Sequence, residues 1–140
     1  MANCVIDQNN VLDSKGTFKA GKTKTLNSLN FEVFKSGNNI LNFYVSGEDD
    51  EKNNYSISFN TIITCEEFLK LDFTNSSDFI KYIDDGDVIF GYNGVFDLDI
   101  KFQISIMKYL SNKYVLNILF KSSNYDSDDI IGDIELIFGL

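Results

Sequence analysis

The stretch that decides the fold is VIFGYNGVFDLDIKFQISI, residues 88–106. Asn93-Gly94 near its middle is the strongest short signal for a two-residue hairpin turn, because both turn positions need positive φ. From Phe96 to Ile106, apolar side chains alternate with polar ones. Alternation with period two places one set of side chains on a dry face and the other in water. The stretch therefore predicts antiparallel strands around a tight turn.

The same alternation recurs on both sides of this stretch. It is found in residues 29–33, 41–45, 55–61, 114–120 and 134–138. Turn-forming residues at 36–39 and 111–113 separate neighbouring segments, as expected for hairpins. We therefore predict a hairpin in the first half of the chain and a three-stranded antiparallel meander in the second half, with one wet and one dry face.

The alternation of apolar and polar residues ends at Thr64-Cys65-Glu66-Glu67, which has the form of a capping box. A short helix is expected from Cys65 to about Leu71. A second short helix, capped at 75–77 (NSS) and ended at 84–87 (DDGD), is expected to carry Phe79, Ile80 and Ile83. The predicted fold class is mainly β (α+β). It is an antiparallel β-sandwich or a large curved antiparallel sheet, with one or two short helices between two β-rich halves.

The chain of 140 residues is expected to form a single domain, 1–140, with residues 1–25 as a loosely structured arm or edge segment. Residues 16–23, GTFKAGKT, match the letters of a phosphate-binding loop. A genuine loop of this kind follows a buried strand and opens a long helix. Neither is predicted here, so a glycine-punctuated loop is favoured over a nucleotide site.

Composition excludes several kinds of chemistry. The chain has no His and no Arg, and its formal net charge is −9. Without His there is no imidazole base or metal ligand, and without Arg there is no bidentate clamp for phosphate or guanine. The negative charge disfavours nucleic acid and anionic membrane surfaces and permits a basic protein partner. The N-terminus has no signal-peptide pattern, so a cytoplasmic location is expected.

Three candidate sites each have a simpler structural interpretation. Cys65 at a helix start could be a nucleophile, but two glutamates adjoin it and the chain has no His, so a structural thiol is favoured, as for Cys4. Asp97 and Asp99 could pair on one strand face, where solvated surface is the simpler reading. Residues 126–137 begin like a calcium loop, but isoleucines occupy three of its required positions. No catalytic residue, metal or cofactor is predicted.

The acids fall mainly in loops and on the face expected for the last strands. Such a distribution projects negative potential and speeds association with a basic partner. The candidate partner-binding residues are Glu48, Asp49, Asp50, Glu51, Asp84, Asp85, Asp87, Asp97, Asp99, Asp126, Asp128 and Asp129. Asp133 and Glu135 on the last predicted strand can extend the face that carries Asp97 and Asp99. Together these four residues would make an acidic sheet face.

From about residue 55 to the end, the chain resembles small bacterial immunity proteins of polymorphic toxin systems, of the wall-associated toxin immunity type. The resemblance rests on 64–69 (TCEEFL) opening a helix after a strand, then Ile89-Phe90 and 98–102 (LDIKF) in successive strands. Such proteins act by binding, so the resemblance implies a protein partner and no catalytic residues.

The sequence therefore favours a non-enzymatic, acidic protein-binding module, an immunity or inhibitor protein that neutralises a toxin or nuclease by direct contact. Three alternatives stay open at this point. The chain could be a phage-encoded inhibitor of a host defence system, a small-ligand binder on a β-sheet, or a structural, oligomeric component.

Overall fold

The structure is a computed structural model, and it describes most of the chain. The described residues are 11–20, 22–26, 29–36, 40–71, 79, 81–84, 88–110, 113–123 and 129–139. Ten strands and one short α-helix lie within them, and all strand pairs are antiparallel.

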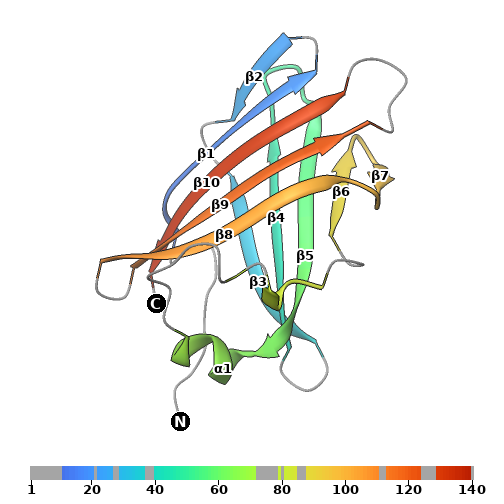
Figure 1. Cartoon of the computed structure of the whole chain (residues 1–140). Coiled ribbons are helices and arrows are strands. Elements are labelled where there is room, and N and C mark those ends of the chain that lie inside the picture. The colour runs from blue at the N-terminus through green and yellow to red at the C-terminus, as the bar shows by residue number, and fades with distance from the viewer. Residues whose placement is uncertain are drawn as a thin grey trace.

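The strands form two five-stranded sheets that face each other (Figure 1). Sheet A has the order β2-β1-β10-β9-β8 and consists of β1 (Val11–Ala20), β2 (Lys22–Leu26), β8 (Lys101–Leu110), β9 (Lys113–Ser122) and β10 (Ile130–Gly139). Sheet B has the order β3-β4-β5-β6-β7 and consists of β3 (Asn30–Ser36), β4 (Ile40–Glu48), β5 (Asn54–Thr64), β6 (Ile89–Tyr92) and β7 (Val95–Asp97). The predicted antiparallel sandwich is thus confirmed.

Aromatic side chains fill the space between the sheets. The rings of Phe31 in sheet B and Phe138 in sheet A lie 5.5 Å apart, and those of Phe90 and Phe120 lie 4.5 Å apart. These separations fall in the range for favourable ring–ring contact. Alternate residues of each strand point into this core, as in β5, where Tyr55, Ile57 and Phe59 are buried.

The predicted hairpins are present. Strands β3 and β4 pair antiparallel, and β8, β9 and β10 form the predicted meander. Asn93 and Gly94 connect β6 to β7 with φ values of 49° and 83°. Both values are positive, as a type I′ turn requires, and this explains why asparagine and glycine occupy these positions.

One part of the deciding stretch folds differently from the expected pattern. Residues 95–106 were expected to alternate as one strand, but β7 pairs in sheet B and β8 in sheet A, with a bend between them. The alternation changes phase where the chain crosses between the sheets. Phe96 and Leu98 are therefore 60% and 64% exposed, whereas Asp97 is 3% exposed.

Buried Asp97 connects the two sheets. Its Oδ1 atom accepts a hydrogen bond from the backbone N–H of Asp99 at 2.9 Å, and its Oδ2 atom accepts one from the hydroxyl of Ser122 in β9. A buried carboxylate needs such partners because its desolvation is otherwise unfavourable. The residue thus fixes the bend that leads from sheet B to sheet A.

Helix α1 (Cys65–Lys70) follows β5 where the capping box was predicted. The Thr64 hydroxyl accepts from the backbone N–H of Glu67 at 3.2 Å, and the Glu67 carboxylate accepts from the backbone N–H of Thr64 at 3.1 Å. In place of the second predicted helix, residues 79, 81 and 82 are in a 3₁₀ conformation. Among the described residues, no helix is long and apolar enough to cross a membrane.

The N-terminal segment contributes two strands to sheet A. β1 pairs with β10 and with β2, and β2 is the edge strand of the sheet. The phosphate-loop letters at 16–23 therefore fall on a strand pair, in which Ala20 faces Lys22. The next elements among the described residues are strands β2 and β3, so the strand–loop–helix context of a nucleotide site is not formed there.

Asp97→Ala should destabilise the fold, because it leaves the buried Ser122 hydroxyl without its acceptor and removes the acceptor of the Asp99 N–H. We expect a loss of roughly 1–3 kcal/mol in the free energy of unfolding, measured by urea denaturation. Asp99→Ala removes an exposed carboxylate from the same bend and should change this free energy by less than about 0.5 kcal/mol. Equal losses in the two variants would contradict the role assigned to Asp97.

Candidate binding groove

A groove crosses the outer face of sheet B, on the side away from the core. It encloses about 570 Å³, within the range of about 300–1,000 Å³ that is usual for ligand-binding clefts. Twelve residues line it: Asn30, Tyr44, Ser46, Gly47, Glu48, Asn54, Tyr55, Ser56, Gly91, Asn93, Gly94 and Phe96.

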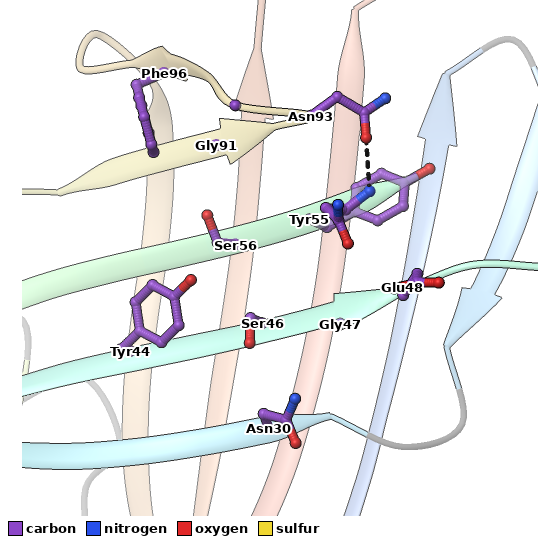
Figure 2. A pocket seen from close by; sticks show the side chains of 12 residues that line it. Asn30, Tyr44, Ser46, Gly47, Glu48, Tyr55, Ser56, Gly91, Asn93 and Phe96 are labelled. Carbon is purple, nitrogen blue, oxygen red and sulfur yellow. Dashed lines mark hydrogen bonds between the residues drawn. The ribbon is translucent and has the colours of Figure 1, made fainter. Parts of the chain in front are cut away.

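Strand register aligns the floor of this groove. Asn30 pairs with Ser46, Ser46 with Ser56, Ser56 with Gly91, and Gly91 with Phe96. These five residues form one row that takes one position from every strand of sheet B, as Figure 2 shows. Side chains directly opposite each other in register share a face. The three central positions carry only serine or glycine, so the middle of the row is low.

Gly91 leaves room for the ring of Phe96 at one end of the groove. A Cβ atom at this position would lie 2.6 Å from the Oγ atom of Ser56 and 2.9 Å from a ring carbon of Phe96. These distances are too short for any side chain unless its neighbours move. The ring of Phe96, on the edge strand β7, lies beside Gly91 of β6 at one end of the groove (Figure 2). It fills the space that the glycine leaves empty, as aromatic rings often do opposite a glycine in a sheet.

Tyr44 forms one side of the groove, and the β4–β5 and β6–β7 turns form the other. The side chain of Asn93 holds these two turns together: its Oδ1 atom accepts from the backbone N–H of Asn54 at 2.7 Å, and its Nδ2 donates to Asn53 at 3.0 Å. The amide is therefore already hydrogen-bonded. It gives the groove a fixed rim.

Asp49 orders the β4–β5 turn from inside. Its Oδ1 atom accepts from the backbone N–H groups of Glu51 and Asn53 at 2.9 and 3.0 Å. Its Oδ2 atom accepts from Nδ2 of Asn53 at 3.0 Å and from the hydroxyl of Tyr55 at 2.9 Å. The buried carboxylate is thus fully engaged within the turn. It was expected to contact a partner, but its position gives it a structural role.

The environment of this carboxylate shifts two pKa values. Burial acts to raise the pKa of Asp49, but the hydrogen bonds from Asn53, Tyr55 and Glu51 outweigh it, so the pKa lies below its usual value. Burial, followed by the hydrogen bond to Asp49, raises the pKa of the Tyr55 phenol. The turn is therefore built around an ionised Asp49 and a neutral Tyr55.

The other acids of the turn face outward. Glu48 lines the groove, and Glu48, Asp50 and Glu51 are all exposed. Glu51 pairs with Lys24 of β2 at 2.5 Å, whereas Glu48 and Asp50 form no ion pair with the described residues. Lys52 is the one cation within the turn, so the net charge of the turn is negative.

The chemistry of the groove is that of a binding surface. The hydroxyls of Tyr44, Ser46 and Ser56 make no hydrogen bond to any described residue, and each can donate and accept. The groove's lining contains no cation. Its single charged side chain is Glu48, at the edge beside the acidic turn. The arrangement can hold a ligand with polar groups along its length and positive charge at one end.

The remaining predicted residues do not gather at one place. Asp84 lies beside Asn60, six residues along β5 from Asn54 and so about 20 Å from the groove's rim. Asp99 follows β7 in the bend toward β8, and Asp129 directly precedes β10 and pairs with Lys121 of β9. Asp85, Asp87, Asp126 and Asp128 lie outside the described residues, as do Cys4 and the side chain of Cys65.

The outer face of sheet A is mixed rather than acidic. Asp133 and Glu135 lie on it as expected, but Asp97 is buried in sheet B and does not join them. Lys15 pairs with Glu135 at 3.6 Å, and Lys121 pairs with Asp129 at 3.4 Å. The exposed apolar side chains of Leu119 and Ile131 interrupt the charges. The predicted acidic sheet face is therefore not formed, because the crossing at 98–100 separates its members.

Sequence reasoning missed Ser46, Ser56, Gly91 and Phe96. A signal was present in β4 and β5, whose outward positions carry serine where exposed strands usually carry charged or longer polar side chains. Only the pairing register shows that these small residues are neighbours. Among the described residues, no group of three or more acids and cysteines is placed to hold a metal ion.

Comparisons of the chain with models of protein families, with curated proteins and with solved structures found no match.

Asp49→Asn should weaken the pH dependence of stability. Because the folded-state pKa of Asp49 lies below its unfolded value of about 3.8, its ionisation stabilises the fold above that pH. This contribution is lost as the pH falls through the folded-state pKa. Urea denaturation between pH 6 and pH 3 should therefore show the gap between wild type and Asp49→Asn narrowing as the pH falls.

Asp50→Asn removes an exposed carboxylate from the same turn and controls for the change in net charge. Parallel curves for wild type and Asp49→Asn over this pH range would show that the Asp49 carboxylate does not stabilise the turn in the way described.

Proposed function

We propose that this protein is a non-catalytic binding protein that contacts a basic partner protein through the outer face of sheet B. In this proposal it works as an immunity or inhibitor protein in the cytoplasm, and it neutralises a toxin or nuclease by direct contact. It needs no cofactor and no metal for this activity.

The observation that carries the proposal is the juxtaposition of a groove with an ordered acidic turn. Glu48 and Asp50 are exposed on either side of Asp49, whose hydrogen bonds define the conformation of the turn. Side chains carried on a rigid turn lose little conformational entropy when they bind. Carboxylates held in this way favour a cationic partner both in rate of encounter and in orientation.

Charge distinguishes between the possible partners. The net charge of −9 repels nucleic acid and anionic lipid, because both present phosphate charges to the approaching protein. A protein surface rich in lysine or arginine is attracted instead. The absence of His throughout the chain also removes the most common general base. These facts favour binding over catalysis.

Neutralising the two outward carboxylates should weaken the complex. The tagged full-length chain is used to capture partners from the cells that encode it, and a partner identified by mass spectrometry is purified for calorimetry. Glu48→Gln/Asp50→Asn should raise the Kd roughly tenfold or more, and added salt should raise the wild-type Kd.

The matched control is Glu66→Gln/Asp133→Asn, which removes the same charge from exposed positions on α1 and on sheet A. It should bind nearly as wild type does. Equal weakening by both double variants would mean that only net charge matters, and a Kd independent of both would refute binding through this turn.

A further inference from the structure

The groove connects two chemically different ends. Glu48 stands at the edge next to the acidic turn, on β4, and Phe96 stands on β7, the edge strand of sheet B. Phe96 is 60% exposed, and of the exposed apolar side chains in this part of the chain it is the one that lines the groove. An exposed aromatic ring at the end of a polar groove offers a contact surface to an apolar side chain.

The distance between the two ends limits what fits. β4 and β7 are separated by three strand spacings, or about 14 Å at roughly 4.8 Å each. An extended chain advances about 3.3–3.6 Å per residue, so about four residues cover this distance. A segment that lies across the strands can therefore place one side chain near Glu48 and another against Phe96.

The floor between these ends suits a peptide backbone. Ser46 and Ser56 each offer a hydroxyl that can donate and accept, and a backbone presents N–H donors and C=O acceptors at short intervals. Gly91 provides a low position beside the ring of Phe96. A folded helix is about 10–12 Å across with its side chains and would rest on the rims, whereas an extended segment reaches the floor.

We propose that the groove binds an extended segment of the partner protein that carries a lysine or arginine about four residues from an apolar side chain. The cation lies beside Glu48 and Asp50, the apolar side chain packs on Phe96, and the intervening backbone lies over Ser46 and Ser56. This inference rests on the proposed function and adds which part of the partner is recognised.

Charge complementarity favours this occupant over two others. A neutral oligosaccharide could use the hydroxyls and the aromatic ring, but it would gain nothing from the carboxylates of Glu48 and Asp50, which form no ion pair with a described residue. A second copy of this chain would bring together two molecules that each carry −9 and repel each other. A cationic segment is attracted by the same carboxylates.

The test is a selection of random 12-residue peptides displayed on phage against the purified full-length chain. Sequences selected by wild type should be enriched in lysine or arginine and in an apolar residue about four positions away. Ser56→Tyr and Ser46→Tyr fill the floor with a residue that favours strands, and each should weaken binding of a selected synthetic peptide about tenfold or more.

Ser105→Tyr makes the same change on an outward position of β8 in sheet A and should bind as wild type does. Phe96→Ala should keep the preference for a cation and lose the preference for an apolar residue. Far-ultraviolet circular dichroism and urea denaturation establish that each variant is folded before binding is measured.

Four results would overturn the inference. One is the absence of such enrichment with wild type. Another is a selected peptide that binds the floor-filled variants as tightly as wild type. A third is that wild type binds maltohexaose and the Ser56→Tyr variant does not. A fourth is that wild type forms a dimer in sedimentation experiments and the Ser56→Tyr variant stays a monomer. A captured partner that still depends on Glu48 and Asp50 in any of these cases leaves the proposed function standing.

Discussion

Packing of phenylalanine rings between the two facing sheets sets the direction of the side chains along the strands. Because Phe43 and Val45 of β4 point into the core, Tyr44, Ser46 and Glu48 must point out. The same constraint acts on β5 and β6, and it brings Ser56 and Gly91 onto the same outer row. The groove on sheet B is thus a consequence of core packing and strand register together. A slip of one residue in a single strand would bury part of its lining and expose core residues instead.

Two buried aspartates stabilise the fold, a role that the acidic composition alone does not indicate. Asp97 connects the sheets through Ser122, and Asp49 orders the turn at the groove's rim. Both belong to the residues that charge alone marked for partner binding. Their burial gives both a role in stability, whereas Glu48 and Asp50 point outward. In the proposed function, these two outward acids are the ones that meet the partner.

Local patterns predicted most of the fold. The Asn93-Gly94 turn, the capping box at Thr64 and the alternation in β8 to β10 each depend on residues close together in the chain, and each is confirmed. The phase change at Asp97 could not be predicted in this way, because Phe96, Leu98 and Ile100 alternate as if in one strand. It depends on a crossing between sheets. The groove was missed for a related reason, since its floor joins five strands that are distant in sequence.

In the proposed function, the outer face of sheet B is the surface that contacts the partner protein. Cross-saturation NMR on the isotope-labelled chain in complex with its unlabelled partner measures which amides lie at the interface. If the partner binds on the outer face of sheet B, intensity losses are expected at the amides of Ser46, Ser56, Gly91 and the β4–β5 turn, and the amides of β8, β9 and β10 stay unaffected. Losses concentrated on β8, β9 and β10, with none along the groove, would contradict binding through this face.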